Sequence, residues 1–323
     1  MVHLVMRRQR APRIAAVGLA SWDRLLTVDR YPSPGGYAIV RRCLELPGGT
    51  TTTSAVAAAR LGAQVSIVAL VGDDAPGRAI REALNREGIM TAWLTTDPSS
   101  PTDAATVIIS VEPAERTIFW HQGARLTRGS RLDITSIFGH DVVLLDVDDL
   151  SLRRFLVDLP AHTVPTARLL GPLTYLADAE TPDALEIAVR HDVIVGNERE
   201  VLAVTGQTRL DRAIRRLQEA MLGKTLRAGL ITRGAAGAVA FTQTERWDTP
   251  AYDVPVVDST GAGDAFAGAV AFAMAQHWAW PDTLRFANAV AALSTRAVGA
   301  QTALPSLDET LALLGYDPRS ISR

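Results

Sequence analysis

The chain has 323 residues, of which 47% are hydrophobic and 21% charged, the balance of an ordinary globular protein. This length allows one large α/β domain or two smaller ones. The net charge of −2 gives no overall positive field that would attract nucleic acid. The single cysteine, Cys43, excludes a disulfide within the chain and favours a reducing compartment. We interpret Cys43 as a small core or sheet residue rather than a reactive thiol.

A short basic stretch comes before an apolar run at residues 14–20. The run is too short for the hydrophobic part of a secretory signal. The chain also lacks any apolar stretch of about 18 residues, the length of a membrane span. We expect residues 13–20 to form a first buried strand behind a frayed basic leader. The sequence therefore predicts a cytoplasmic protein that binds neither membrane nor nucleic acid.

Short apolar runs alternate with helix-forming segments through most of the chain. The apolar runs are residues 13–20, 64–72, 141–147, 167–172, 192–197 and 227–234. The helix-forming segments are residues 51–61, 76–87, 180–190, 198–205, 208–222, 262–277, 282–298 and 307–315. Strands and helices that alternate at this spacing predict βαβ units and a mostly parallel sheet.

Two segments break this alternation. Residues 24–46 carry a Pro/Gly turn between β-like runs, and residues 104–121 resemble a hairpin around Glu112 and Glu115. Neither segment has helical periodicity. We predict antiparallel strands that project from the main sheet as a lid. An extension of the sheet edge is an alternative that the pattern equally allows.

The stretch VVDSTGAGDAFAGA combines two valines, a run of small turn residues and the start of an alanine-rich helix. We expect a strand ending near Val257, because ligands of parallel sheets bind beyond the carboxyl ends of strands. The backbone N–H groups of Gly261, Ala262 and Gly263 can converge at the positive end of the new helix and form an anion site suited to phosphate. Beside such a site, Asp264 is suited to accept a proton from an attacking hydroxyl. The alternative is that it merely favours the helix N-terminus.

The segment DSTGAGDAFAGA resembles the C-terminal signature of the ribokinase-like (PfkB) carbohydrate kinases. Four further segments resemble that family in the same order: residues 47–89, GNERE at 196–200, ITRGAAG at 231–237 and the closing FANAVAALSTRAVGAQTALPS. The resemblance implies one ribokinase-like α/β domain over residues 1–323, with lid strands inserted at about 24–46 and 104–121. It also implies ATP and Mg²⁺ as cofactors. The chain contains neither a P-loop nor a dinucleotide-binding glycine motif.

The resemblance assigns roles around the phosphates. Asp264 is the catalytic base, and the amides that hold the transferring phosphoryl group are those of Gly261, Ala262 and Gly263. Asn197 and Glu200 organise the phosphates and the Mg²⁺ shell, Glu200 through water. The alternative for this pair is a helix cap with its capping-box partner.

The resemblance also assigns a nucleotide site and a site for a monovalent cation. Thr232, Gly234 and Gly237 line the nucleotide site, and Asn288 approaches the adenine, with a helix-surface amide as the alternative. The positions that match a potassium site are Asp258, Thr260, Ser294, Ala297 and Gly299.

In the acceptor site, Asp23 matches the residue that binds sugar hydroxyls, while Gly48 and Gly49 let the backbone approach the sugar. Thr53 stands where the family usually has Asn, and Thr50 where many members have Lys or Asn. The usual hydrogen-bond pattern therefore does not transfer, and the missing lysine disfavours a phosphorylated acceptor.

Other residues are weaker candidates for the acceptor site. Asp149 follows a predicted strand and is the further acceptor contact that we expect. Lid arginines at 41, 42 and 116 can still supply positive charge. Trp22, Trp120 and His121 are candidates for an apolar wall, with lid or core packing as the alternative.

The sequence thus predicts an ATP-dependent kinase that phosphorylates a hydroxymethyl group of a small sugar or sugar-like alcohol. A nucleoside acceptor is one alternative, and it would need a large aromatic residue facing the pocket from the lid. A nucleotide-binding sensor that does not turn over is another. Exposed edges of the lid strands also predict a homodimer joined through the lid.

Overall fold

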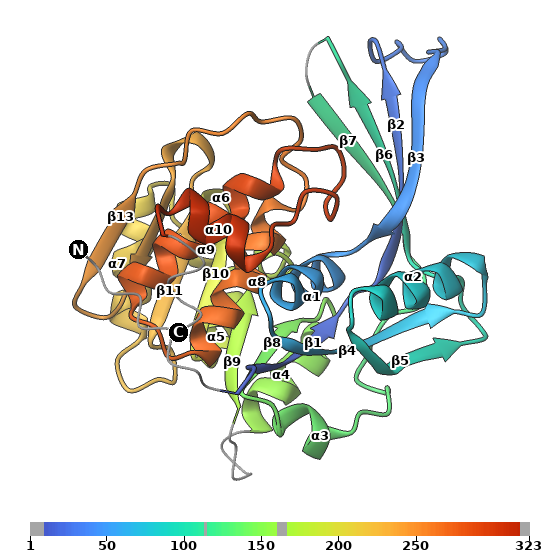
Figure 1. The fold of residues 1–323 in the computed structure, drawn as a ribbon. Helices are drawn as coiled ribbons and strands as arrows, with labels where there is room; N and C mark the ends of the chain where they lie inside the picture. The colour runs from blue at the N-terminus through green and yellow to red at the C-terminus, as the bar shows by residue number, and fades with distance from the viewer. Residues whose placement is uncertain (1–9, 113–114, 160–166, 317–323) are drawn as a thin grey trace.

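The computed structural model describes residues 10–112, 115–159 and 167–316, so residues 1–9 of the predicted leader lie outside the described residues. Its centre is a nine-stranded sheet (Figure 1). The strands in spatial order are β13 (Arg246–Thr249), β12 (Ala238–Phe241), β11 (Ala228–Thr232), β10 (Val193–Asn197), β9 (Arg168–Pro172), β8 (Val142–Asp146), β1 (Arg13–Gly18), β4 (Gln64–Gly72) and β5 (Met90–Asp97). Only β12 and β13 are antiparallel to their neighbours. The predicted mostly parallel sheet is confirmed.

Helices cover both faces of this sheet because alternate strand residues point to opposite sides. Ile14 and Ala16 of β1 join one buried cluster, and Ala15 and Val17 join the other. The first face is covered by α1 (Thr50–Arg60), α2 (Ala75–Arg86), α8 (Ala262–Ala275) and α9 (Trp280–Ser294), with α10 (Leu307–Leu313) packed on α9. The second face is covered by α3 (Ile134–Phe138), α4 (Leu150–Asp158), α5 (Thr181–Ala188), α6 (Glu198–Thr205) and α7 (Leu210–Ala220). Among these described helices, none has both the length and the apolar character needed to cross a bilayer.

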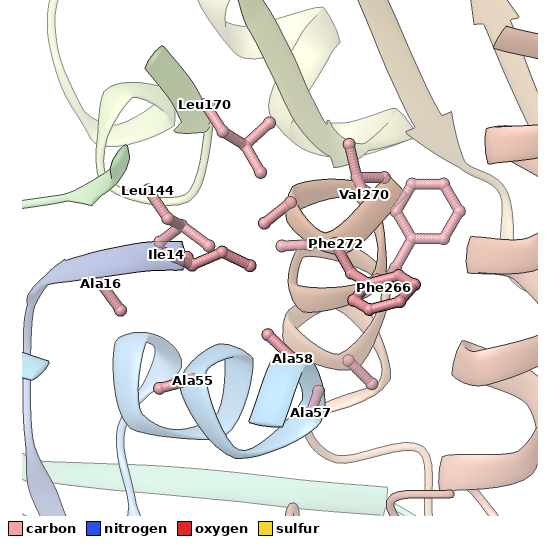
Figure 2. Close-up of a cluster of buried hydrophobic side chains, with 14 of the residues drawn as sticks. Ile14, Ala16, Ala55, Ala57, Ala58, Leu144, Leu170, Phe266, Val270 and Phe272 are labelled. Carbon is pink, nitrogen blue, oxygen red and sulfur yellow. The ribbon is translucent and has the colours of Figure 1, made fainter. Parts of the chain in front are cut away.

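Small residues let α1 and α8 approach closely, as Figure 2 shows for Ala57 and Ala58 beside the helix that carries Phe266. A side chain at Gly268 of α8 would overlap the carbonyl oxygen of Ser54 and lie 2.8 Å from Ala57 Cβ. The Ser54 hydroxyl donates a 2.9 Å hydrogen bond to the carbonyl of Asp264. The crossing of these two helices therefore fixes the position of Asp264.

A second sheet of four strands projects from one end of the molecule (Figure 1). Its order is β3 (Val40–Gly48), β2 (Ser21–Val28), β6 (Ala104–Ser110) and β7 (Glu115–His121). The predicted lid is confirmed as a separate sheet, so the alternative of an extended sheet edge is wrong. The pairing of β2 with β6 is parallel, whereas we expected only antiparallel strands. Cys43 lies in β3 and is exposed, so it is a sheet residue and not a core residue.

The strand expected to end near Val257 is not formed. Val256 and Val257 are exposed by 68% and 59%, in an extended loop outside both sheets. The N–H groups of Val257 and Asp258 both donate to the carbonyl of Thr295, at 2.8 and 3.0 Å. A β-branched pair favours extended backbone, but here the loop is held by the end of α9 rather than by a strand ladder.

Candidate active site

The glycine turn that the sequence predicts to bind phosphate stands at the start of α8; we refer to it as the phosphate-binding turn on the basis of this prediction. Gly261 precedes the helix with a φ of 77°, and a side chain there would lie 2.6 Å from Ala300 Cβ. Only glycine fits this left-handed conformation without strain. Gly263, by contrast, has no atom within 4 Å of where a Cβ would stand. The N–H groups of the turn thus lie at the positive end of a long helix with open space beside them, the arrangement that binds anions.

Asp258 ties this turn to the loop after α9. Its Oδ1 accepts hydrogen bonds from the N–H and hydroxyl of Thr260, at 2.9 and 2.7 Å, and its Oδ2 accepts from the N–H of Gly299 at 2.9 Å. The structure therefore brings together three of the five residues expected around a monovalent cation. The Ser294 hydroxyl instead donates to Ala291 within its own helix.

A pocket of about 660 Å³ opens beside the turn. It brings together the predicted nucleotide residues Thr232, Gly234, Gly237 and Asn288 with Ala262 and Gly263 of the turn. Our sequence analysis did not identify the residues that complete its lining, which are Ala235, Ala251, Tyr252, Asp253, Val254, Val256, Ser259, Ala291, Ala292 and Thr295. Most of these belong to the extended loop that we had expected to be a strand.

Asn288 is only 7% exposed, so the alternative of a helix-surface amide is wrong. Its side-chain N–H donates to the carbonyl of Pro250 at 2.8 Å. The amide thereby holds the beginning of the loop that forms one wall of the pocket.

Asn197 and Glu200 form a complete capping box at the start of α6. The Asn197 side chain accepts from the N–H of Glu200, and the Glu200 carboxylate accepts from the N–H of Asn197, both at 2.9 Å. Burial raises the pKa of Glu200, and the charge of Asp146 raises it further. The capping box uses only one oxygen of the Glu200 carboxylate, and this carboxylate stays close enough to Asp146 for the two groups to interact electrostatically.

Asp264 lies in a strongly acidic environment. Burial raises the pKa of its carboxyl well above the usual value, and the negative charges of Asp146, Glu200 and Asp23 add to the effect. A carboxylate with a raised pKa is a stronger base, which suits proton abstraction near neutral pH. Three chain segments that are distant in the sequence thus act electrostatically on this one group.

Asp146 ends β8 and is fully buried. Its Oδ2 accepts a 3.4 Å hydrogen bond from Thr51, while its Oδ1 has no hydrogen-bond partner among the described residues. The buried Arg153 of α4 acts on it from a distance, and burial lowers the pKa of that guanidinium to about 10. Our sequence analysis did not assign Asp146 a role, although its position at the carboxyl end of a parallel strand was a usable signal.

The threonine run of α1 is used mainly inside the protein. The Thr51 hydroxyl also accepts from the N–H of Leu19 at 3.0 Å, and that of Thr52 donates to the Gly48 carbonyl. Gln301 donates to the Thr53 hydroxyl at 3.3 Å. Thr50 is hydrogen-bonded at 3.3 Å to the hydroxyl of Tyr175, which follows β9. The run therefore ties the start of α1 to β1, to the loop after β9 and to the loop after α9, and the bond between Thr50 and Tyr175 was not predicted from the sequence.

Asp23 lies directly against Gly48. A side chain on Gly48 would come within 2.5 Å of all three carboxylate atoms, so only glycine leaves room for them. Gly49 starts α1 with a φ of 93°. Burial raises the pKa of Asp23 to about 6; the Ser21 hydroxyl opposes this rise, and the charge of Asp103 adds to it.

Asp149 has a structural task. Its Oδ1 accepts from the N–H of Leu152 at 2.8 Å and caps α4. The preceding residue, Asp148, instead pairs with Arg125 at 3.0 Å. Burial raises the pKa values of Tyr175 and Asp103, and the charge of Asp148 makes a smaller contribution in the same direction. On this side of the pocket Asp148, rather than Asp149, acts electrostatically on the neighbouring site residues.

The family model described as "pfkB family carbohydrate kinase" matches residues 11–307. The chain belongs to the pfkB family of carbohydrate kinases. A ribokinase of Bacillus subtilis is 29% identical over 306 residues, which are 93% of this chain and 99% of the relative. A nucleoside kinase of Methanothermobacter thermautotrophicus is 27% identical and covers 94% and 97% of the two chains.

Solved structures agree with this pfkB membership. The structure of Arabidopsis thaliana ribokinase complexed with ribose and ATP has a TM-score of 0.82 and 25% identity, covering 95% of this chain and all of that one. The ribokinase-like fold and the kinase class, both predicted from the ordered motifs, are confirmed.

The lid of this pfkB protein reaches the phosphate-binding turn. Arg116 of β7 donates a 3.3 Å hydrogen bond to the hydroxyl of Ser259, which lines the nucleotide pocket. Arg41, another lid arginine, instead pairs with Asp29 at the far end of the lid. Arg116 therefore brings a positive charge from the lid to the segment just before the glycine turn.

Across residues 10–112, 115–159 and 167–316, no three His, Cys, Asp or Glu side chains are grouped so that they could hold a metal ion by themselves. Mg²⁺ keeps several waters and is often bound by only one or two carboxylates together with substrate phosphates. The donors of this pfkB site, Glu200 foremost, fit that mode of binding rather than a preformed metal cage.

Proposed function

We propose that this protein transfers the γ-phosphoryl group of ATP to a hydroxymethyl group of a small sugar, with Asp264 as the general base. The position of Asp264 carries the proposal. The residue follows Gly263, which lines the nucleotide pocket, and lies near enough to Asp23 for the Asp23 charge to raise its pKa. Asp264 therefore stands between the two halves that phosphoryl transfer has to join.

In the proposed reaction, the acceptor hydroxyl gives its proton to Asp264 and its oxygen bonds to the γ-phosphorus. The bond from the γ-phosphorus to the β–γ bridging oxygen breaks, and ADP leaves. The amides of Gly261, Ala262 and Gly263 stabilise the transferring group, and losing one comparable donor costs about 10²–10³ in rate. Arg116 adds positive charge from the lid. Mg²⁺, held by phosphate oxygens and through water by Glu200, would neutralise the phosphate charge.

The remaining proposed site residues follow from this reaction. Asp23 binds acceptor hydroxyls, with Gly49 and Thr53 beside it, and Asp149 stays a candidate acceptor contact despite its capping bonds. The cation site of Asp258, Thr260, Ser294, Ala297 and Gly299 would hold potassium, largely through backbone oxygens. Closure of the lid would exclude water and suppress hydrolysis of ATP.

We also propose a homodimer joined through the lid. β7 is an edge strand of the lid with an exposed apolar side chain on each face, Ile118 at 53% and Phe119 at 51%, so a second lid could pair with this edge and cover them. Light scattering after size exclusion at micromolar concentration should give a mass twice that of one chain, which is 34.6 kDa. A monomer would contradict the dimer without affecting the proposed reaction.

A nucleoside is the second candidate acceptor, supported by the position of Trp120. This residue lies opposite Ala105, which lies opposite Asp23 in the next strand, so the indole and the carboxylate share one face of the lid. An aromatic ring on that face could stack on a base. The nucleoside kinase among the relatives supports the same candidate.

The test is ADP release from Mg·ATP with D-ribose, D-fructose and adenosine as separate acceptors. We expect one of them to stimulate release, and Asp264→Asn to slow it by at least ~10³ with ATP affinity nearly unchanged. Asp308→Asn is the matched control, because Asp308 also lies in the first turn of a helix but is exposed. Near-normal turnover in Asp264→Asn would overturn the role of Asp264. Equal losses in both variants would support the helix-terminus alternative.

A further inference from the structure

One face of the lid looks toward the phosphate site. Leu46, Asp23, Ala105 and Trp120 lie opposite one another across the four strands, so their side chains share that face. A side chain at Gly299 would lie 2.5 Å from Leu46 Cδ1, which shows that this face meets the loop tied to the phosphate-binding turn. Trp120 therefore belongs to the acceptor side of the lid.

A buried carboxylate fixes the indole of Trp120. Asp103, just before β6, is 0% exposed, and both of its oxygens lie 2.9 Å from Trp120 Nε1. Oδ2 also accepts from the N–H of Gly123 at 3.2 Å. On its other side, the guanidinium of Arg125 lies 5.7 Å from the centre of the indole ring and binds Asp148. The ring is thus held at its edge and over its face.

The backbone at Asp103 is itself held firmly. The Thr102 hydroxyl accepts from the N–H of Gly72 at 2.9 Å and donates to Asp74, which also accepts from the N–H of Thr102 at 2.8 Å. A side chain at Gly123 would lie 2.5 Å from the nitrogen of Asp103. Gly72 and Asp74, through Thr102, and the close approach of Gly123 therefore position this carboxylate at the base of the lid.

The Trp120 indole N–H needs a hydrogen-bond acceptor, but this need alone does not explain why the acceptor is a carboxylate, that of Asp103. A neutral oxygen would serve, and a second buried carboxylate near Asp23 is unfavourable. Asp103 lies against the strand of Asp23, because its carbonyl accepts a 2.8 Å hydrogen bond from the N–H of Trp22, and its charge acts on Asp23. The Ser21 hydroxyl donates to Asp23, and the charge of Asp23 in turn acts on Asp264 of α8. Asp103 is thus both the anchor of Trp120 and a charged neighbour of the proposed acceptor-binding residue.

We propose that Asp103 is a positioning residue of the acceptor site, which holds Trp120 as a wall beside Asp23 and makes Asp23 bind acceptor hydroxyls in a pH-dependent way. This inference rests on the proposed function, because it takes Asp23 as the acceptor-binding residue. The acceptor that fits has hydroxyls at one edge, for the carboxylate, and an apolar or planar face for the indole. A ring-form sugar or a nucleoside has both features.

The first experiment needs no acceptor. The side-chain carboxyl signal of Asp23, assigned by its loss in Asp23→Asn, is followed by NMR from pH 4 to pH 8 in ¹³C-labelled protein. We expect a titration step near pH 6, where Asp23 ionises, and a step at clearly lower pH in Asp103→Asn, because the neighbouring negative charge is gone. Asp29→Asn removes an exposed lid carboxylate that pairs with Arg41 and should leave the step in place. The same step in wild type and in Asp103→Asn would overturn the proposal.

The second experiment measures kcat and KM with D-ribose, D-fructose or adenosine, whichever stimulates ADP release. Asp103→Asn and Trp120→Phe should each raise the KM for that acceptor about tenfold, while kcat and the KM for ATP change less than about twofold. In Asp103→Asn the acid limb of kcat/KM should move to lower pH, which a merely structural role would not cause. An unchanged acceptor KM in both variants of an active enzyme would refute only the role of Asp103. A wild-type protein that no acceptor stimulates would refute the proposed function, and the acceptor role of Asp103 with it.

Discussion

Adding one methyl group at Gly48 should damage acceptor binding and little else. The new Cβ would lie within 2.5 Å of all three atoms of the Asp23 carboxylate, well inside van der Waals contact. The carboxylate has to move by about 1 Å to restore normal contact, which is enough to break a hydrogen bond to a bound hydroxyl. Losing a hydrogen bond to a charged group costs about 1.5–3 kcal/mol, so we expect the acceptor KM of Gly48→Ala to rise about 10- to 150-fold.

Steady-state ADP release, measured separately against acceptor and ATP, is the assay. The KM for ATP should stay within about twofold, because the nucleotide pocket lies on the other side of Asp264. Gly129→Ala is the matched control, because the nearest atom to a Cβ there is 3.8 Å away. A Gly48→Ala variant with a normal acceptor KM would refute the assignment of Asp23 to acceptor binding. A rise in both KM values would point to a general distortion of α1.

Three further predictions test other parts of the site. The pKa of Asp23 is about 6 against an ordinary 3.8, so the folded state binds this proton more tightly than the unfolded chain and stability falls as pH rises through that range. In urea unfolding, Asp23→Asn should therefore raise the free energy of unfolding by about 2–3 kcal/mol at pH 8 and hardly at all at pH 3.5. An equal increase at both pH values would show that the buried negative charge of Asp23 is not the cause. Gly268→Val should lower the free energy of unfolding by about 3 kcal/mol or more, because the valine side chain would overlap the backbone of α1 at Ser54. An unchanged urea midpoint would contradict this close packing of α1 and α8. Arg116→Gln should lower kcat about tenfold if the lid charge acts on the phosphates, and a rate equal to that of wild type would remove that role.

The fold was largely predictable because its signals are local and repeated. Alternating apolar runs and helical segments predicted six strands of the main sheet, and the Pro/Gly turn at residues 32–36 marked the lid. Helix α4, whose start depends on the Asp149 cap, was not predicted, and the strand predicted to end near Val257 does not form. An isolated β-branched pair predicts extended backbone but not a partner, and the partner of this loop is a single carbonyl at the end of α9.

On the proposed phosphate side, the predicted residues do line one pocket, and their pattern could be recognised because phosphate binding would use backbone N–H groups. A turn that approaches a phosphate closely requires small residues, and Gly261 and Gly263 meet this requirement. Asn288 lines the same pocket, and it could be assigned because it lies in the closing segment that resembles the family.

The acceptor side depends on contacts between segments that are far apart in the sequence. Thr50 looked like a lost amide or lysine, yet its hydroxyl pairs with Tyr175 from the other half of the chain. Asp103 carried no motif at all, and its meaning arises only when β6 and β7 bring it to Trp120. Each of these side chains is held by partners within the protein. The shape of the proposed acceptor site therefore depends on those partners, which the sequence of a single segment does not reveal. Changing Trp120 or Asp103 should therefore alter acceptor choice more than changing any residue of the phosphate turn, whose losses should fall equally on every acceptor.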